Sequence, residues 1–139
     1  MDYVAYISTP QNQTKADPKI TKLRLSRGRL SGGFLYFPRG PSGYLHFIAR
    51  IGVHQIVPYN IDQSYRLNGC VVPLHIDIDF FEPPYIIDCV TWNESTEFPH
   101  VLTVCFFLDP YAKPRVAKGI LKSLYDATLG YKTGGDRKT

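Results

Sequence analysis

The chain has 139 residues, of which 44% are hydrophobic and 20% are charged, and this composition excludes wholesale disorder and fits one folded domain. The formal net charge of +4 is unevenly distributed. Residues 1–39 and residues 111–139 each carry seven basic and two acidic side chains, whereas residues 40–110 carry two basic and eight acidic side chains. An acidic centre repels phosphate, so nucleic acid is an unlikely partner and an acidic protein surface is the expected one.

The first elements along the chain are short and interrupted. We expect residues 1–18 to form an arm or linker, in which residues 3–7 are an edge strand or an arm and the rest is polar. Residues 21–25 alternate between apolar and basic side chains, as in a half-buried strand. Residues 30–37 are strand-like, and Gly32-Gly33 within them predicts a bulge or a close approach of another backbone.

The clearest strand patterns lie in the middle of the chain. Residues 45–51 and residues 74–80 alternate between apolar and polar side chains, with the period of a strand that buries one face. Residues 85–92 and residues 101–108 are two further strands, and the second is almost wholly apolar, which predicts cover on both faces. Residues 19–110 are therefore expected to form an all-β domain, an antiparallel β-sandwich or jelly roll of seven to eight short strands.

The pattern changes from β to helical after Pro110. Pro114 suits the first turn of a helix and Gly130 suits its C-terminal cap. The apolar residues that recur at helical spacing are Val116, Ile120, Leu124 and Ala127. We expect residues 111–139 to form one C-terminal α-helix followed by a basic tail.

No motif in the sequence indicates an enzyme, a metal site or a cofactor. The four histidines lack zinc spacing, and the glycine-rich turns lack the lysine of a phosphate-binding loop. His75, Asp77 and Asp79 share one strand face, but carboxylates spaced along a strand do not converge on a cation, so cation binding there is left open. The cysteines, expected to be free thiols, are Cys70, Cys89 and Cys105. No apolar run is long enough to cross a membrane.

A succession of turn and core positions runs through residues 20–110. It consists of Gly28-x-Leu30-x-x-Gly33-x-Leu35-x-Phe37-Pro38-x-Gly40-x-x-Gly43, Gln55-Ile56-x-Pro58-x-Asn60, Pro83-Pro84-Tyr85, Trp92-Asn93, His100 and Leu108-Asp109-Pro110. This succession resembles small β-sandwich structural proteins of tailed phages and related viruses, of the decoration or minor capsid kind. The resemblance implies a non-enzymatic protein present in many copies and held by strand and terminal-arm contacts. It carries over no functional residues, because the pattern contains no site.

The expected function is that of a structural subunit in a multi-copy assembly, in particular a virus particle. Such a subunit would act by self-association, by arm exchange and by docking on a larger protein lattice. Its location would be the virion, or otherwise the cytoplasm, because no signal peptide is recognised. The basic residues expected to meet acidic patches of other copies are Arg115, Lys118, Lys122, Lys132, Arg137 and Lys138.

Two alternatives stay open at the level of sequence. One is a carbohydrate- or ligand-binding sandwich, in which Asp77 and Asp79 hold calcium and aromatic side chains stack on sugars. Those aromatic residues are Tyr36, Tyr44, Tyr59 and Trp92. The other is a barrel that binds single-stranded nucleic acid through aromatic side chains and a basic stripe. The stripe consists of Lys15, Lys19, Lys22, Arg24, Arg27 and Arg29.

Overall fold

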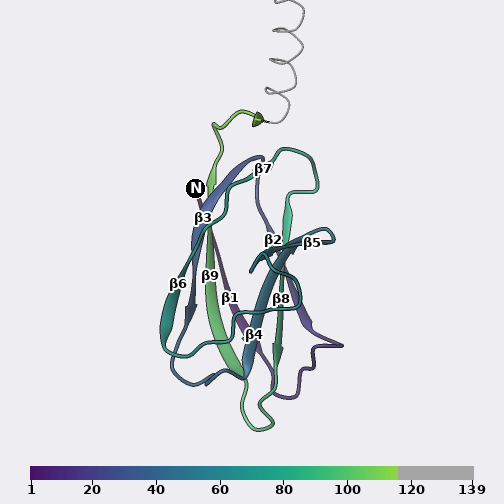
Figure 1. Ribbon diagram of the computed structural model, residues 1–139, viewed down its shortest axis with the longest axis vertical. Coiled ribbons are helices and arrows are strands. Elements are labelled where there is room, and N and C mark those ends of the chain that lie inside the picture. Colours follow the sequence, from purple (N-terminus) through teal and green to yellow (C-terminus); the bar gives the residue numbers. More distant parts are fainter. Residues whose placement is uncertain (116–139) are drawn as a thin grey trace, which may run out of the picture.

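The structure, a computed structural model, describes residues 1–115, which form two antiparallel sheets packed face to face (Figure 1). The strands of these residues are β1 (Asp2–Thr9), β2 (Lys19–Arg24), β3 (Gly28–Phe37), β4 (Leu45–Ile51), β5 (His54–Val57), β6 (Cys70–Leu74), β7 (Ile78–Phe80), β8 (Ile86–Asn93) and β9 (His100–Asp109). The five-stranded sheet has the order β1-β9-β3-β6, with β7 also paired to β3, and the four-stranded sheet has the order β2-β8-β4-β5.

The predicted all-β class is confirmed, and two facing antiparallel sheets are consistent with the predicted sandwich. The core lies between the sheets, because each strand turns its alternate apolar side chains inward. The largest fully buried side chains include Phe37, Phe47, Phe106, Leu35 and Leu102. The predicted C-terminal helix and tail lie, from residue 116 onward, outside the described residues.

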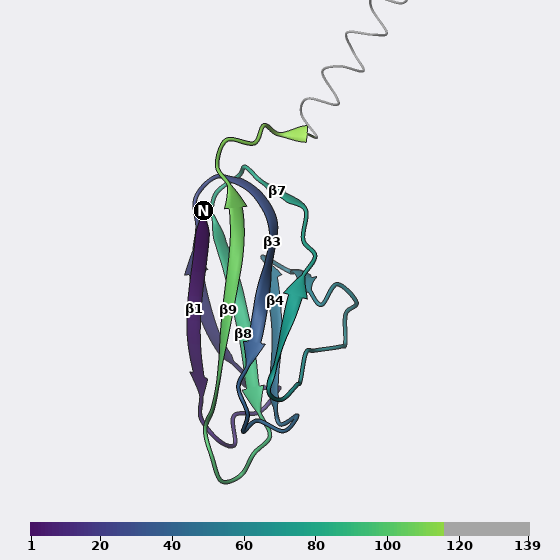
Figure 2. The ribbon, with the colours of Figure 1, turned by 90° about the vertical axis from the view of Figure 1, so that its left-hand side faces the viewer.

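The amino-terminal segment is part of the five-stranded sheet. Residues 2–9 pair with β9 over their whole length, and the Met1 carbonyl accepts a hydrogen bond from Leu108 N–H at 2.7 Å. Ile7 and Thr9 are buried on the inner side of this strand. Residues 2–9 are therefore an edge strand (Figure 2), one of the two forms expected for residues 3–7, and the expectation of an arm or linker over residues 1–18 is wrong for this strand.

The predicted strand over residues 74–80 is wrong in its bounds, because the structure has two short strands there. β6 pairs with Gly33–Phe37 of β3, and β7 pairs with Gly28–Leu30 of the same strand. The pairing is interrupted opposite the point where the register of β3 against β9 shifts, between Leu30 and Gly32. This bulge confirms the irregularity predicted at Gly32-Gly33, and it divides the edge of β3 between two partners.

The expectation that both faces of residues 101–108 are covered is only half met. The inner face of β9 is fully buried through Leu102, Val104, Phe106 and Leu108. On the outer face, Phe107 is exposed and Val101 and Thr103 are half-buried. Its apolar outer positions are thus left partly open by the described residues.

Candidate functional site

The outer face of the five-stranded sheet carries two neighbouring rows of mostly apolar side chains. The register aligns Val4, Cys105, Phe34 and Pro73 in one row, and Tyr6, Thr103, Tyr36 and Val71 in the next. We call the following set the apolar face: Val4, Tyr6, Phe34, Tyr36, Val71, Pro73, Val101, Cys105 and Phe107. It comes from β1, β9, β3 and β6, and sequence analysis missed it because the strand register brings its members together.

Several side chains of the apolar face are well exposed. Tyr6 is 71% exposed, Val4 62% and Val71 59%, and the Phe34 and Phe107 rings lie 6.3 Å apart between centroids. Three strand spacings of about 4.8 Å and six residue steps of about 3.4 Å give the apolar face roughly 14 by 20 Å. The largest exposed apolar patch of a soluble monomer is typically a few hundred Å² and often functional.

The outer face of the four-stranded sheet carries a row of charged side chains beside an apolar row, which consists of Ile20, Val90 and Ile48. Lys22 Nζ lies 2.9 Å from Asp88 Oδ1, and Arg50 Nε lies 3.7 Å from Asp88 Oδ2, so three strands share one row of ion pairs. The basic stripe expected near residues 15–29 does not form one surface. Lys22 lies on this outer face, whereas Arg29 lies on the outer face of the other sheet and pairs with Asp79.

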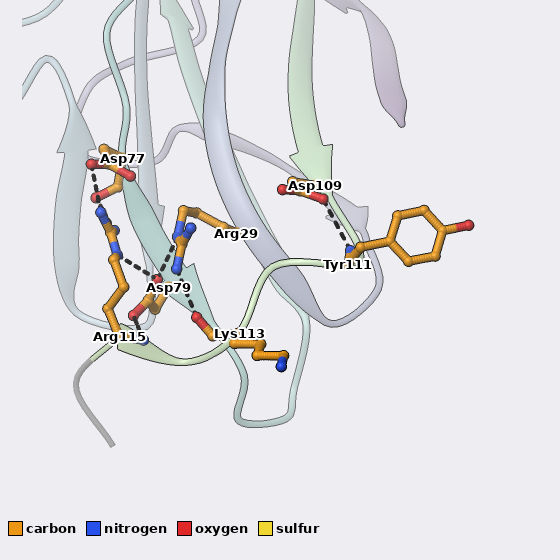
Figure 3. A network of polar contacts seen from close by, with 7 residues as sticks. All are labelled: Arg29, Asp77, Asp79, Asp109, Tyr111, Lys113 and Arg115. Carbon is orange, nitrogen blue, oxygen red and sulfur yellow. Dashed lines mark hydrogen bonds and ion pairs between the residues drawn. The ribbon is translucent and has the colours of Figure 1, made fainter. Parts of the chain in front are cut away.

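A cluster of ion pairs holds the chain where it leaves β9 (Figure 3). Arg115 Nη1 lies 2.8 Å from Asp77 Oδ2, and Arg115 Nε lies 3.3 Å from Asp79 Oδ1. Asp79 also accepts hydrogen bonds from Arg29 Nε at 2.9 Å and from the backbone N–H of Arg115 at 3.0 Å. Arg29 Nη2 donates to the Lys113 carbonyl at 2.7 Å. We call Arg29, Asp77, Asp79 and Arg115 the C-terminal clasp.

The C-terminal clasp gives Arg115 acidic partners within its own chain. Arg115, expected to meet acidic residues of another copy, pairs with Asp77 and Asp79 of its own chain. The same two carboxylates were the candidate cation ligands beside His75, and in the structure arginine side chains contact them. Within residues 1–115, no three His, Cys, Asp or Glu side chains are grouped so as to hold a metal ion.

The clasp lowers the pKa of both carboxyl groups. For Asp77 the main cause is the hydrogen bond from Arg115, which favours the ionised form. For Asp79, desolvation acts to raise the pKa, but the hydrogen bonds from Arg29 and Arg115 and the positive charges of both side chains together outweigh it. The hydrogen bond with Asp77 in turn raises the pKa of Arg115.

We expect the stabilisation by the clasp to be complete above the ordinary aspartate pKa of about 3.9 and to be lost as the pH falls through the lowered folded-state values. The free energy of unfolding, measured with urea from pH 7 down to pH 2, should be higher for the wild type than for Arg115→Ala at neutral pH. The difference should disappear at the acidic end. A difference that does not change with pH would contradict this account of the clasp.

A groove of about 650 Å³ lies over the outer face of the four-stranded sheet, lined by residues 12–15, by residues 62–64 and by side chains of β4 and β8. His46 is 6% exposed at its floor and stacks on Trp92, with 4.8 Å between ring centroids. His46 Nδ1 lies 2.7 Å from Ser64 Oγ, and Nε2 lies 3.0 Å from Glu94 Oε1. Lys15 Nζ lies 5.7 Å from the Trp92 ring centroid.

Burial governs the protonation of this histidine. Desolvation lowers the pKa of His46 despite the opposing effect of Glu94, so the ring is neutral at pH 7. A carboxylate only accepts, so Nε2 carries the proton that Glu94 accepts, and Nδ1 accepts the proton of the Ser64 hydroxyl. A hydroxyl, an imidazole and a carboxylate in this order are also the elements of a serine nucleophile and its base. Sequence analysis missed the group because its members are far apart in the chain.

The aromatic residues proposed to stack on a ligand do not form one platform. Tyr36 belongs to the apolar face, and Trp92 is buried in the groove against His46. Tyr44 and Tyr59 are exposed on the connections before β4 and after β5. Among the basic residues proposed to bind a partner, the structure places Arg115 alone. Lys118, Lys122, Lys132, Arg137 and Lys138 lie outside the described residues.

The cysteines of residues 1–115 are free, as expected. Burial raises the pKa of Cys89 to about 12 and also raises the pKa of Cys105. In the described part of the chain, no helix is long and apolar enough to cross a membrane. Comparison of the chain with protein-family models, with curated proteins and with solved structures finds no match.

Proposed function

We propose that this protein is a structural subunit of a multi-copy assembly, such as a virus particle, and that copies associate through the apolar face. The observation that carries the proposal is the exposure of Val4, Tyr6 and Val71 in adjacent rows of one sheet. The resemblance of residues 20–110 to decoration and minor capsid proteins also implies a structural protein that is present in many copies. In this role the sandwich acts as a rigid body rather than as a catalyst.

A difference in the most exposed side chains of the two outer faces supports the proposal. The four-stranded sheet presents the ion pairs of Lys22, Asp88 and Arg50 to water, as the surface of a monomer would. The five-stranded sheet presents tyrosine, valine and phenylalanine side chains, and of these tyrosine and phenylalanine are favoured where protein surfaces associate. In an isolated subunit these side chains would be exposed to water, and association would bury them.

The proposal is tested by measuring the dissociation constant of the full chain in sedimentation experiments. The variant Tyr6→Lys/Tyr36→Lys should weaken association about 100-fold, because each lysine replaces an aromatic contact worth about 1.4 kcal/mol or more with a charge. The matched control is Val53→Lys/Tyr59→Lys, which changes two side chains that are 90% and 83% exposed elsewhere. A wild-type chain that stays monomeric, or a control that dissociates equally, would contradict the proposal.

The groove supports a second candidate function, the binding of a small polar ligand such as a saccharide. It combines an aromatic floor with hydrogen-bonding and charged side chains of both signs, as ligand sites do. Trp92 is the only tryptophan of the chain, so its fluorescence reports directly on the groove. A panel of mono- and disaccharides should change this fluorescence in the wild type and less in Glu94→Gln. No change with any sugar would remove the candidate, and covalent labelling of Ser64 by a fluorophosphonate would point to a hydrolase instead.

A further inference from the structure

The chain leaves the sandwich on the same side of the five-stranded sheet as the apolar face. Asp109, Arg29 and Asp79 form one cross-strand row on the outer side of β9, β3 and β7. Phe107 of the apolar face lies two residues from Asp109 along β9 and has its side chain on the same side. The C-terminal clasp therefore fixes Arg115, the residue directly before residues 116–139, at one end of the apolar face.

The clasp also sets the direction in which the chain continues. Asp79 Oδ2 accepts the backbone N–H of Arg115, which directly follows Pro114. The sequence predicts a helix beginning at this point, and a carboxylate that accepts the first free N–H groups lies at the N-terminal end of a helix. A helix with this cap runs away from Asp79. Figures 1 and 2 show the chain after β9, up to residue 115, beyond the ends of the strands and not over the sheet.

The size of the apolar face fits the stripe predicted in the C-terminal segment. From Val116 to Ala127, the first and last residues of the stripe, there are 11 residue steps of about 1.5 Å, or roughly 17 Å of helix. From Val101 to Phe107 of β9 there are six steps of about 3.4 Å, or roughly 20 Å, so the stripe fits within the length of the apolar face. When a helix packs along a sheet, its apolar stripe and the apolar face of the sheet are both removed from water.

We therefore propose that the apolar face is the docking surface for residues 116–131 of a second copy of this chain. The inference rests on the proposed function and names the partner segment. In each copy the clasp fixes Arg115, the residue directly before this segment. The segment then extends beyond the end of its own sandwich. Its stripe, which contains Val116, Ile120 and Leu124, packs on the apolar face of a neighbouring copy. The clasp gives every copy the same point of departure, which a regular assembly requires.

The test places the photo-cross-linking residue p-benzoylphenylalanine at Tyr36 of the full chain. Chains labelled with ¹⁴N and ¹⁵N are unfolded together in urea, refolded, irradiated and analysed by mass spectrometry. We expect cross-links from position 36 to residues 116–131, about half of them joining unlike isotopes. Cross-links between like isotopes only would show docking within one copy and overturn the inference, as would an assembly in which position 36 cross-links elsewhere or not at all. A chain that stays monomeric in light scattering would overturn the proposed function as well.

A matched pair of variants gives a second readout. Leu124 lies on the predicted stripe, and its neighbour Tyr125 lies off it. Leu124→Lys should raise the dissociation constant of the assembly at least 10-fold, whereas Tyr125→Lys should change it less than about threefold. Equal effects of the two variants would contradict docking through the stripe.

Discussion

Gly33→Ala is expected to lower the free energy of unfolding by about 3 kcal/mol. A Cβ at this position would overlap the carbonyl oxygen of Cys105, and it would lie 3.1 Å from the carbonyl carbon of Cys105 and from the Cα of Phe106. These are backbone atoms of β9, the strand paired with β3 at the centre of the sheet, so no side-chain rotation relieves the overlap. Either β3 and β9 separate at this point, or their pairing is lost.

The matched control for Gly33 is Gly52→Asn. A Cβ at Gly52 meets nothing within 4 Å, and asparagine tolerates the positive φ of 60° better than most residues. This variant should lower the free energy of unfolding by less than about 1 kcal/mol. Urea unfolding of both variants measures the difference. If both variants lowered the free energy of unfolding equally, β3 and β9 would not approach each other as closely as they do in the structure.

The second large effect is expected for Asn93→Ala, at about 3 kcal/mol for three lost hydrogen bonds. Asn93 is fully buried at the end of β8, and its Nδ2 donates to the carbonyls of Thr9 at 3.2 Å and Phe98 at 3.0 Å. Its Oδ1 accepts the backbone N–H of Ser95 at 3.0 Å. The side chain thus joins the end of β1 to the connection between β8 and β9, and its loss leaves buried backbone groups without partners.

Asn68→Ala is the matched control for Asn93. Asn68 Oδ1 also accepts two hydrogen bonds from backbone N–H groups, of Gly40 at 2.9 Å and of Ser42 at 3.0 Å, but its surroundings are exposed. Water replaces these partners, so the loss in the free energy of unfolding should stay below about 1 kcal/mol. The account of Asn93 would be contradicted if the two variants unfolded at the same urea concentration.

Local patterns predicted the class of the fold, because alternation along a strand marks the side that a sheet buries. The inward residues of β4 follow from their spacing alone, whereas the almost wholly apolar sequence of β9 does not mark which of its faces is inward. The division between β6 and β7 cannot be predicted from local spacing, because it depends on the bulge in β3, which is a different part of the chain.

The candidate surfaces could not be predicted in the same way. His46 and Glu94 are 48 residues apart, and Arg115 and Asp77 are 38 apart, so only the folded chain brings them together. The unequal distribution of charge led us to expect contacts of Arg115 between copies, whereas its acidic partners in the structure belong to the same chain. The members of the apolar face come from four strands, and only the register of those strands makes them neighbours.

The most direct test of the central claim, association through the apolar face, is hydroxyl-radical footprinting of the full chain at low and high protein concentration. The oxidation rates of Tyr6, Tyr36 and Phe107 should fall several-fold as the concentration rises, because association covers them. Tyr59 and Val53, which are exposed elsewhere, should react at the same rate throughout. If Tyr6 and Tyr36 stay as reactive at high concentration as at low, the apolar face does not mediate association.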